Sequence, residues 1–194
     1  MRFAIGHKIT RPLTIVMVFV GLTLGGAGGF YVYVESDGNF HVVDRGTLYR
    51  SRQLSGIELA QAIGAYGIRS ILNLRGANPG RDWYDDEMAV SAAKNVIHHD
   101  YGISARRPVT PAQLEEILRI IRDAPKPMLV HCMGGADRTG LVSAIYLFSH
   151  GARPDEAKRE LSLRFGHFPY LGSKTRAMDD SFNAYVVAST MQTK

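Results

Sequence analysis

A glycine-bearing loop at residues 132–140 lies between a short apolar run, residues 128–131, and a strongly apolar segment, residues 141–150. When a strand turns directly into a helix, successive backbone N–H groups converge above the helix N-terminus and can bind an anion. Gly134 and Gly135 supply the unusual dihedral angles and the close backbone approach that such a turn requires. The loop therefore predicts an anion-binding site on a strand–loop–helix unit.

The same alternation of strands and helices extends along the chain from about residue 40. Strand-like runs are found at residues 42–50, with a turn at Gly46, and at residues 68–74, 96–101 and 128–131. Helical segments are expected at residues 55–66, 83–95, 110–123, 141–150, 154–165 and 174–190. This order predicts an α/β fold with a central, mostly parallel sheet flanked by helices. A length of 194 residues favours a single such domain.

Some helix boundaries are marked by specific residues. Ser55 is a suitable N-cap for the helix that runs to residue 66, and Gly67 is placed to end it. Thr110 is a suitable N-cap for the helix at residues 111–123, which has Pro111 in its first position. These two helices are therefore expected to have well-defined ends.

The net charge of the chain is formally +5, from 23 Lys and Arg against 18 Asp and Glu. Three basic residues, Arg2, Lys8 and Arg11, precede residue 35, and no acidic residue does. Residues 35–194 therefore carry 20 basic and 18 acidic side chains, a surplus of only +2. This balance excludes the charge pattern of a nucleic-acid-binding protein.

The first apolar segment of the chain is long enough to cross a membrane. Residues 13–34 are 22 residues without a charge, and about 20 apolar residues span the hydrocarbon core of a bilayer. Several glycines and the lack of a polar face argue against a buried helix of a soluble core. We predict a transmembrane signal anchor at residues 13–34, after a basic N-terminal flank at residues 1–12. The alternative is a signal peptide that is cleaved near Gly25 and Ala27.

The charges on either side of this segment predict its orientation. The basic flank precedes it, whereas Glu35 and Asp37 follow it. Because basic flanks tend to stay on the cytoplasmic side, the N-terminus is expected in the cytoplasm. The rest of the chain is then expected on the exported side, which is the periplasm in a bacterium. If the segment were cleaved, the rest of the chain would be secreted.

The loop contains the residue types of a nucleophilic phosphate site. Cys132, the only cysteine of the chain, opens the loop and has no partner for a disulfide within the chain. A thiol beside converging N–H groups ionises easily, and the thiolate is the reactive form. Arg138, six residues later, can return over the loop and bind two oxygens of a phosphoryl group. The Thr139 hydroxyl can reach the sulfur, and His131 can orient the cysteine.

Residues 131–139 resemble the signature His-Cys-x5-Arg-Ser/Thr of the cysteine-dependent protein tyrosine and dual-specificity phosphatases. The segments LYRSRQL, SILNLRG, HHD and RFGH are similar to the compact bacterial and plant–fungal atypical dual-specificity branch of that family. The resemblance covers residues 44–190, which it predicts to be a phosphatase domain, and leaves residues 35–43 as a linker. It implies a phosphate-binding loop formed by Met133, Gly134, Gly135, Ala136, Asp137 and Arg138.

The resemblance also implies a reaction. In this family the cysteine attacks phosphorus and forms a phosphocysteine, which water then hydrolyses. The implied catalytic residues are Cys132 and Arg138, with His131 and Thr139 in supporting roles. No cofactor or metal is implied, and His98 and His99 lack partners at metal-ligand spacing.

A general acid is the third catalytic group that the resemblance implies. In this family it is an aspartate about thirty residues upstream of the cysteine, on a mobile loop. Asp100 lies 32 residues before Cys132 and is the first candidate. Asp137 is the second candidate, because related lipid phosphatases have given an aspartate before the arginine this role. Asp137 can also simply brace the loop, and neither aspartate need be the acid.

The substrate class is only partly constrained by the sequence. The loop interior lacks the lysines of many inositide-specific relatives, which favours a phosphorylated protein or a small phosphate ester as substrate. Arg75, Arg106 and Arg107 either contact a second phosphate or are solvated loop side chains. Contact with a second phosphate would favour the alternative of an inositol-phosphate or phosphoinositide phosphatase. A non-catalytic phosphate-binding module is the remaining alternative. The expected partners are therefore a phosphate ester and, through residues 13–34, a membrane.

Overall fold

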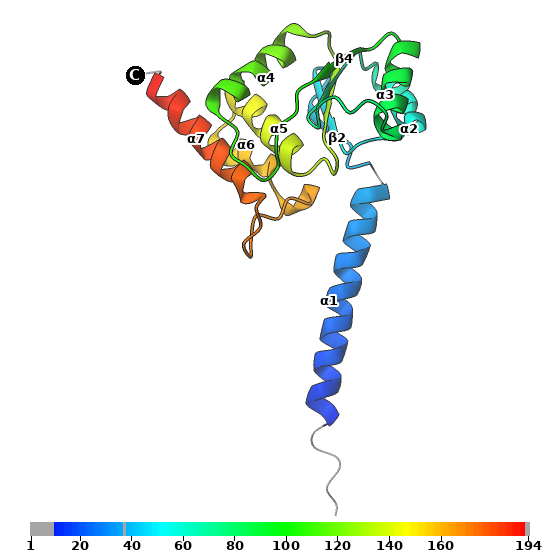
Figure 1. Ribbon diagram of the computed structural model, residues 1–194. Helices are drawn as coiled ribbons and strands as arrows, with labels where there is room; N and C mark the ends of the chain where they lie inside the picture. The colour runs from blue at the N-terminus through cyan, green and yellow to red at the C-terminus, as the bar shows by residue number, and fades with distance from the viewer. Residues whose placement is uncertain (1–9, 37, 193–194) are drawn as a thin grey trace, which may run out of the picture. The chain divides into compact units, whose positions relative to one another are not determined.

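The computed structural model describes residues 10–36 and 38–192. The chain divides into two compact units between residues 37 and 38. The first unit contains one helix, α1 (Thr10–Ser36) (Figure 1). Within the described residues, no helix is both long and apolar enough to cross a membrane. The transmembrane anchor predicted at residues 13–34 is therefore not confirmed. Arg2, Lys8 and Asp37, which predicted its orientation, lie outside the described residues.

The second unit is an α/β domain with a five-stranded sheet (Figure 1). The strands are β1 (His41–Asp44), β2 (Leu48–Ser51), β3 (Ser70–Asn73), β4 (Ile97–Asp100) and β5 (Met128–His131). Their order in the sheet is β1-β2-β5-β3-β4, in which β1 is antiparallel to β2 and the other pairs are parallel. The predicted α/β fold with a mostly parallel sheet is confirmed.

Helices cover both faces of the sheet. They are α2 (Gly56–Tyr66), α3 (Asp82–Ala93), α4 (Pro111–Asp123), α5 (Asp137–Ser149), α6 (Pro154–Ala157), the 3₁₀ turns η1 (Lys158–Glu160) and η2 (Leu163–Phe165), and α7 (Arg176–Gln192). Successive residues of a strand point to opposite faces. In β5, Met128 and Val130 accordingly belong to the apolar cluster under α4, α5 and α7, whereas Leu129 belongs to the cluster under α2. The sheet is thus buried on both sides.

The four parallel strands end in register at one edge of the sheet. Ser51 and Asn73 both lie opposite His131, and Asn73 also lies opposite Asp100. Residues that follow the carboxyl ends of parallel strands meet at the same edge, where α/β proteins bind their ligands. The loop that starts at Cys132 leaves the sheet at this edge.

The capping residues identified in the sequence occupy the expected positions. The Ser55 side chain accepts from the backbone N–H of Glu58, and Gly67 adopts a left-handed conformation after α2. The Thr110 side chain accepts from the backbone N–H of Gln113, and Pro111 is the first residue of α4. Both helices have the complete capping box, which satisfies N–H groups that lack an intrahelical partner.

Three boundaries differ from the prediction. Helix α5 begins at Asp137 rather than near residue 141, so that the helix starts within the loop. The helix predicted at residues 154–165 is broken into α6, η1 and η2. This segment passes very close to α5, since a Cβ on Gly140 would lie 2.7 Å from the Glu160 carbonyl oxygen. The stretch 35–43 is not only a linker, because β1 begins at His41 and pairs with β2.

Candidate active site

The loop between β5 and α5, residues 132–138, is referred to here as the cysteine loop. Three consecutive carbonyl groups of the loop accept hydrogen bonds from residues 38–53: Met133 from Gln53 N (3.1 Å), Gly134 from Asn39 Nδ2 (2.9 Å) and Gly135 from Arg50 Nη2 (2.6 Å). The C=O and N–H of a peptide unit point in opposite directions. The N–H groups that follow these carbonyls therefore face the other side of the loop. This is the arrangement expected of an anion-binding nest.

Gly135 is required by the path of the loop. Its φ is +69°, and a Cβ at this position would lie 2.7 Å from the backbone N of Arg52 and the carbonyl carbon of Ser51. A contact of 2.7 Å with backbone atoms cannot be relieved by a side-chain rotation. The glycine thus allows the loop to pack directly against the end of β2.

Cys132 and Arg138 occupy the two ends of the nest. Cys132 is buried, with 2% of its surface exposed. Nη1 of Arg138 donates to the carbonyl oxygens of Leu74 (3.1 Å) and Ile103 (3.5 Å), and no carboxylate is among its hydrogen-bond partners in the described part of the chain. Nε of Arg138 and Oγ1 of Thr139 are buried without a hydrogen-bond partner among the described residues. The site therefore presents a thiol and free donors to an anionic group.

Arg50 supports the cysteine loop from inside the core. Its side chain is fully buried, and Nη1 pairs with the Glu160 carboxylate at 2.5 Å and with the Glu160 carbonyl oxygen at 3.0 Å. Nη2 donates to the Gly135 carbonyl. The guanidinium also stacks on the Phe165 ring, 3.8 Å from the centroid. A buried charge is tolerated only when it is paired and hydrogen-bonded, and these contacts join β2, the loop and the segment after α6.

His131 is oriented by a buried carboxylate. Oε1 of Glu87 lies 3.1 Å from Nε2 of His131 and 2.7 Å from Nε2 of His98. Gln53 donates to the other carboxylate oxygen at 2.5 Å. Burial opposes ionisation of Glu87, but these hydrogen bonds outweigh it and lower the pKa of the carboxyl group to about 2. Glu87 therefore fixes the ring of the residue before Cys132 with a permanent negative charge.

Asp100 lies at the carboxyl end of β4 and is held by two donors. Oδ1 accepts from Nδ2 of Asn73 (2.8 Å), and Oδ2 accepts from the Tyr84 hydroxyl (2.5 Å). The hydrogen bond to Asp100 is the main reason that the pKa of Tyr84 is raised to about 12. Among the described residues, Asp100 forms no hydrogen bond or ion pair with the cysteine loop. The structure thus places Asp100 at the edge of the sheet from which the cysteine loop leaves, without a hydrogen bond to that loop among the described residues.

Asp137 contacts His167, whose ring in turn contacts Asp179 of α7. Its Oδ1 lies 2.7 Å from Nδ1 of His167, and Nε2 of the same ring lies 2.8 Å from Oδ2 of Asp179. The His167 side chain is completely buried. Of the two roles considered for Asp137, these contacts match a carboxylate that braces the loop.

The three arginines considered for a second phosphate differ in their surroundings. Arg75 stacks on Trp83, with 3.4 Å from the guanidinium carbon to the ring centroid, and its Nη1 donates to Oε1 of Gln53 (3.2 Å). Burial, and next the positive charge of Arg138, lower the pKa of Arg75. Trp83 and Gln53 thus fix the position of the Arg75 cation near the cysteine loop. Arg106 and Arg107 are exposed in the loop after β4.

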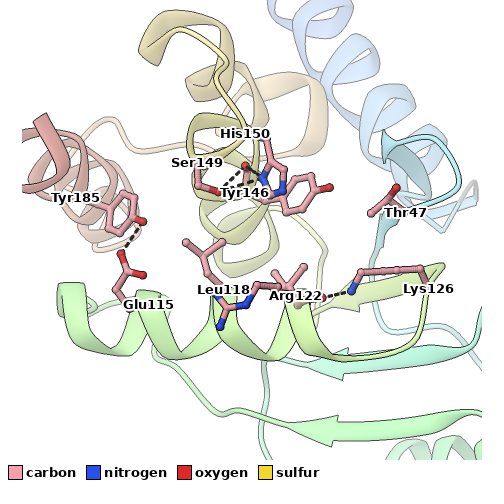
Figure 2. A pocket seen from close by; sticks show the side chains of 10 residues that line it. Thr47, Glu115, Leu118, Arg122, Lys126, Tyr146, Ser149, His150 and Tyr185 are labelled. Carbon is pink, nitrogen blue, oxygen red and sulfur yellow. Dashed lines mark hydrogen bonds between the residues drawn. The ribbon is translucent and has the colours of Figure 1, made fainter. Parts of the chain in front are cut away.

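A second cavity lies at the opposite edge of the sheet, lined by residues that include Thr47 before β2, Lys126 before β5 and His150 after α5 (Figure 2). Its polar groups are largely bonded to one another or to backbone. Tyr185 donates to Glu115 at 2.8 Å, and Nζ of Lys126 caps carbonyl groups at the end of α4. None of the residues that line this cavity belongs to the cysteine loop, and none of them is a cysteine.

Comparison with known families agrees with this geometry. Residues 38–181 match the family described as Swiss Army Knife protein, DSP-PTPase phosphatase domain (PTP-SAK). The chain belongs to this family. The match includes β1, so that the phosphatase domain starts before residue 44. No curated protein matches the chain.

Solved structures of phosphatases share the fold of this phosphatase domain. TpbA of P. aeruginosa is 21% identical with a TM-score of 0.61, and the match covers 77% of this chain and 86% of that one. The core catalytic domain of the PP-IP phosphatase SIW14 from S. cerevisiae, in complex with citrate, is 20% identical with a TM-score of 0.61, covering 79% and 93%. A TpbA variant in complex with pTyr is 20% identical with a TM-score of 0.58, covering 77% and 91%.

Several residues of the site of this phosphatase domain were not identified from the sequence. Asn39, Arg50, Glu87 and Asp179 contact the cysteine loop or a residue that holds it. Arg50 lies in LYRSRQL and His167 in RFGH, two of the segments that carry the family resemblance. Membership in these segments is the one sequence feature that could have identified them as residues of the site. Asn39 and Glu87 lie in no motif, so that only their contacts reveal them.

Proposed function

We propose that this chain is a phosphate-monoester hydrolase that forms a phosphocysteine on Cys132. The observation that carries the proposal is the cysteine loop itself. Its carbonyl groups are tied on one side, its N–H groups face the other, and Arg138 has no carboxylate partner in the described residues. A phosphoryl group would satisfy these donors, with the sulfur of Cys132 behind it.

In the first step, the Cys132 thiolate attacks phosphorus. The S–P bond forms while the P–O bond to the leaving group breaks, and the leaving oxygen takes a proton from a general acid. Negative charge on the three non-bridging oxygens is stabilised by the loop N–H groups and by Arg138. In the second step, water attacks phosphorus and gives a proton to the carboxylate that the general acid became in the first step. The P–S bond breaks, and the Thr139 hydroxyl stabilises the departing thiolate. Inorganic phosphate leaves.

Asp100 is our proposal for the general acid. Two observations support it: the spacing of 32 residues before Cys132, and the position of Asp100 at the strand end in register with Asn73 and His131. Its hydrogen bonds to Asn73 and Tyr84 would have to rearrange when it takes up and donates a proton. The contacts of Asp137 with His167 support a bracing role for that aspartate instead.

For the substrate we propose a phosphorylated protein or a small phosphate ester. One relative with this fold has been solved in complex with pTyr, and another is named a PP-IP phosphatase. The second candidate is therefore an inositol phosphate or phosphoinositide. Arg75 favours this candidate, because it is a second cation near Arg138 that could bind another anionic group of the substrate.

The decisive experiment compares the full chain with its Cys132→Ser variant. We expect the wild type to hydrolyse p-nitrophenyl phosphate and the variant to be inactive but still to bind orthovanadate or phosphate. If both proteins bind phosphate and neither hydrolyses the ester, the chain is a phosphate-binding module. Turnover by the variant at the wild-type rate would exclude Cys132 as the nucleophile.

For the location we propose that residues 13–34 anchor the chain with its N-terminus in the cytoplasm and the phosphatase domain exported. The support comes from the sequence alone: an uncharged run of 22 residues lies between a basic flank and two acidic residues. The described part of helix α1 does not add to this support. Protease added to spheroplasts should then digest the domain. Protection of the domain until the cells are lysed would contradict this topology.

A further inference from the structure

The cysteine loop contains a carboxylate, which is an unusual component for a site that binds a dianion. Asp137 directly precedes Arg138 and is the first residue of α5. A carboxylate at a helix N-terminus interacts favourably with the helix dipole. It also repels a phosphate group bound at the same N-terminus, since like charges in a poorly solvated site repel strongly. A free carboxylate here would oppose the function proposed for the loop.

The structure pairs this carboxylate with a buried histidine. Nδ1 of His167 lies 2.7 Å from Oδ1 of Asp137, and Nε2 lies 2.8 Å from Oδ2 of Asp179 in α7. An ionised carboxylate can only accept hydrogen bonds, so that both ring nitrogens must carry a proton to satisfy both partners. This geometry describes an imidazolium. Burial alone would lower the pKa of His167, but the two carboxylates outweigh burial and raise it.

The charges around the ring balance. Asp137 comes from α5, Asp179 from α7, and Nζ of Lys158 in η1 lies 3.6 Å from Oδ1 of Asp179. With His167 charged, two negative and two positive groups neutralise one another. The positive charge of Arg138 is then left for the anion. Without His167, the cluster carries one net negative charge next to the nest.

The backbone around His167 is fixed to the same loop. Gly166 adopts a left-handed conformation, and the N–H of His167 donates to the Ser162 carbonyl at 3.1 Å. Nδ2 of Asn39 donates to the carbonyl groups of both Gly134 and Phe165 at 2.9 Å. The segment that carries the ring is therefore tied to the loop through one buried amide side chain, Asn39.

We propose that His167 is a positioning residue of the phosphatase site: as an imidazolium it turns the Asp137 carboxylate toward α7 and neutralises its charge, so that the cysteine loop binds a phosphate dianion. The inference rests on the proposed function of the loop. It also assigns Asp137 to the support of the loop and not to proton transfer, because the carboxylate is engaged by His167.

The test measures binding of inorganic phosphate by calorimetry, in the Cys132→Ser background of the full chain. We expect His167→Gln, which keeps the size but not the charge, to weaken phosphate binding about tenfold. Adding Asp137→Asn should restore affinity to within about threefold of the parent, because the uncompensated charge is gone. His150→Gln is the matched control, since His150 lies at the other end of α5 and should have no effect.

Two results would overturn the inference: unchanged phosphate affinity in His167→Gln, or no recovery in the double variant. If His167→Gln does not fold, ¹⁵N NMR of the parent protein decides, since both ring nitrogens of His167 should be protonated at pH 6.5, the ordinary pKa of a histidine. A neutral tautomer at that pH would equally overturn it. These measurements need no turnover, so that a chain that binds phosphate without hydrolysing esters would contradict the proposed function and leave this inference standing.

Discussion

Arg50 donates a hydrogen bond of 2.6 Å to the carbonyl oxygen of Gly135 while its own side chain is fully buried. Eighty-five residues separate the two in the sequence. This bond helps to turn the peptides of the cysteine loop so that their N–H groups face the anion site. The charge that supports the site thus lies beneath the loop, where the substrate does not reach it.

Replacement of Arg50 by methionine should therefore destabilise the domain. The variant removes a fully buried cation and leaves the Glu160 carboxylate, whose side chain is 15% exposed, without its partner. Loss of one partner of a buried pair costs about 3–5 kcal/mol, which is the upper bound for this half-buried pair. Urea unfolding measures the effect. The matched control is Arg119→Met, which removes an exposed pair with Glu116 and should change stability by less than about 1 kcal/mol. Equal effects of the two variants would contradict the role of Arg50.

Replacement of Gly135 by alanine should abolish phosphate binding. The added Cβ would lie 2.7 Å from backbone atoms of residues 51 and 52, at a φ of +69° that alanine disfavours. The loop must move, and its N–H groups lose their alignment. Gly64→Ala is the control, because a Cβ at Gly64 in α2 meets no atom within 4 Å. Phosphate affinity measured by calorimetry should fall only in Gly135→Ala.

Replacement of Asp100 by asparagine should reduce kcat/KM, and the loss should be larger for substrates with a more basic leaving group. General acid catalysis typically contributes 10²–10⁴-fold, so an alkyl phosphate with a basic leaving group should lose about that much in kcat/KM. p-Nitrophenyl phosphate, whose leaving group needs little protonation, should lose much less. Asp137→Asn should show no such dependence on the leaving group. If the loss depends on the leaving group in Asp137→Asn and not in Asp100→Asn, Asp137 is the general acid and Asp100 is not.

Ionisation of Glu87 should make stability depend on pH at the acidic end. Its pKa is lowered from 4.5 to about 2 in the folded protein. The stabilisation is therefore complete above pH 4.5 and is lost as the pH falls toward 2. The shift corresponds to about 3 kcal/mol. Denaturant unfolding at several pH values should show Glu87→Gln less stable than wild type at pH 7, with a difference that narrows below pH 4.5. Glu116→Gln, which is exposed, should show no such narrowing.

Replacement of Arg75 by methionine should change substrate selectivity more than basal activity. We expect kcat/KM for substrates with a second phosphate to fall about tenfold, as for the loss of one close charge pair. The value for p-nitrophenyl phosphate should change about twofold or less. Arg119→Met, at an exposed position of α4, is the control. A uniform loss on all substrates would show that Arg75 acts through Arg138 and not on a second anionic group.

The sheet and most of the helix boundaries were predictable because their signals are local. Helix α4 and strand β5 have the predicted ends, set by Thr110 and by an apolar run that follows two prolines. The segment at residues 154–165 was mispredicted because its helical pattern is interrupted by contacts with Gly140 and Arg50, far away in the sequence. A close backbone crossing leaves no signature in local composition.

The sequence by itself predicted the chemistry of the loop, because Cys132, the glycines and Arg138 are neighbours in the chain and their spacing allows them to surround one anion. Only the tertiary structure decided what surrounds them. The sequence left two roles open for Asp137, and the hydrogen bond from His167, thirty residues later, favours one of them. The sequence assigned no role to Glu87 or Arg50, whose contacts appear only in the folded domain. The role of a charged side chain depends on the groups that desolvate and neutralise it, and folding brings these together from distant parts of the sequence.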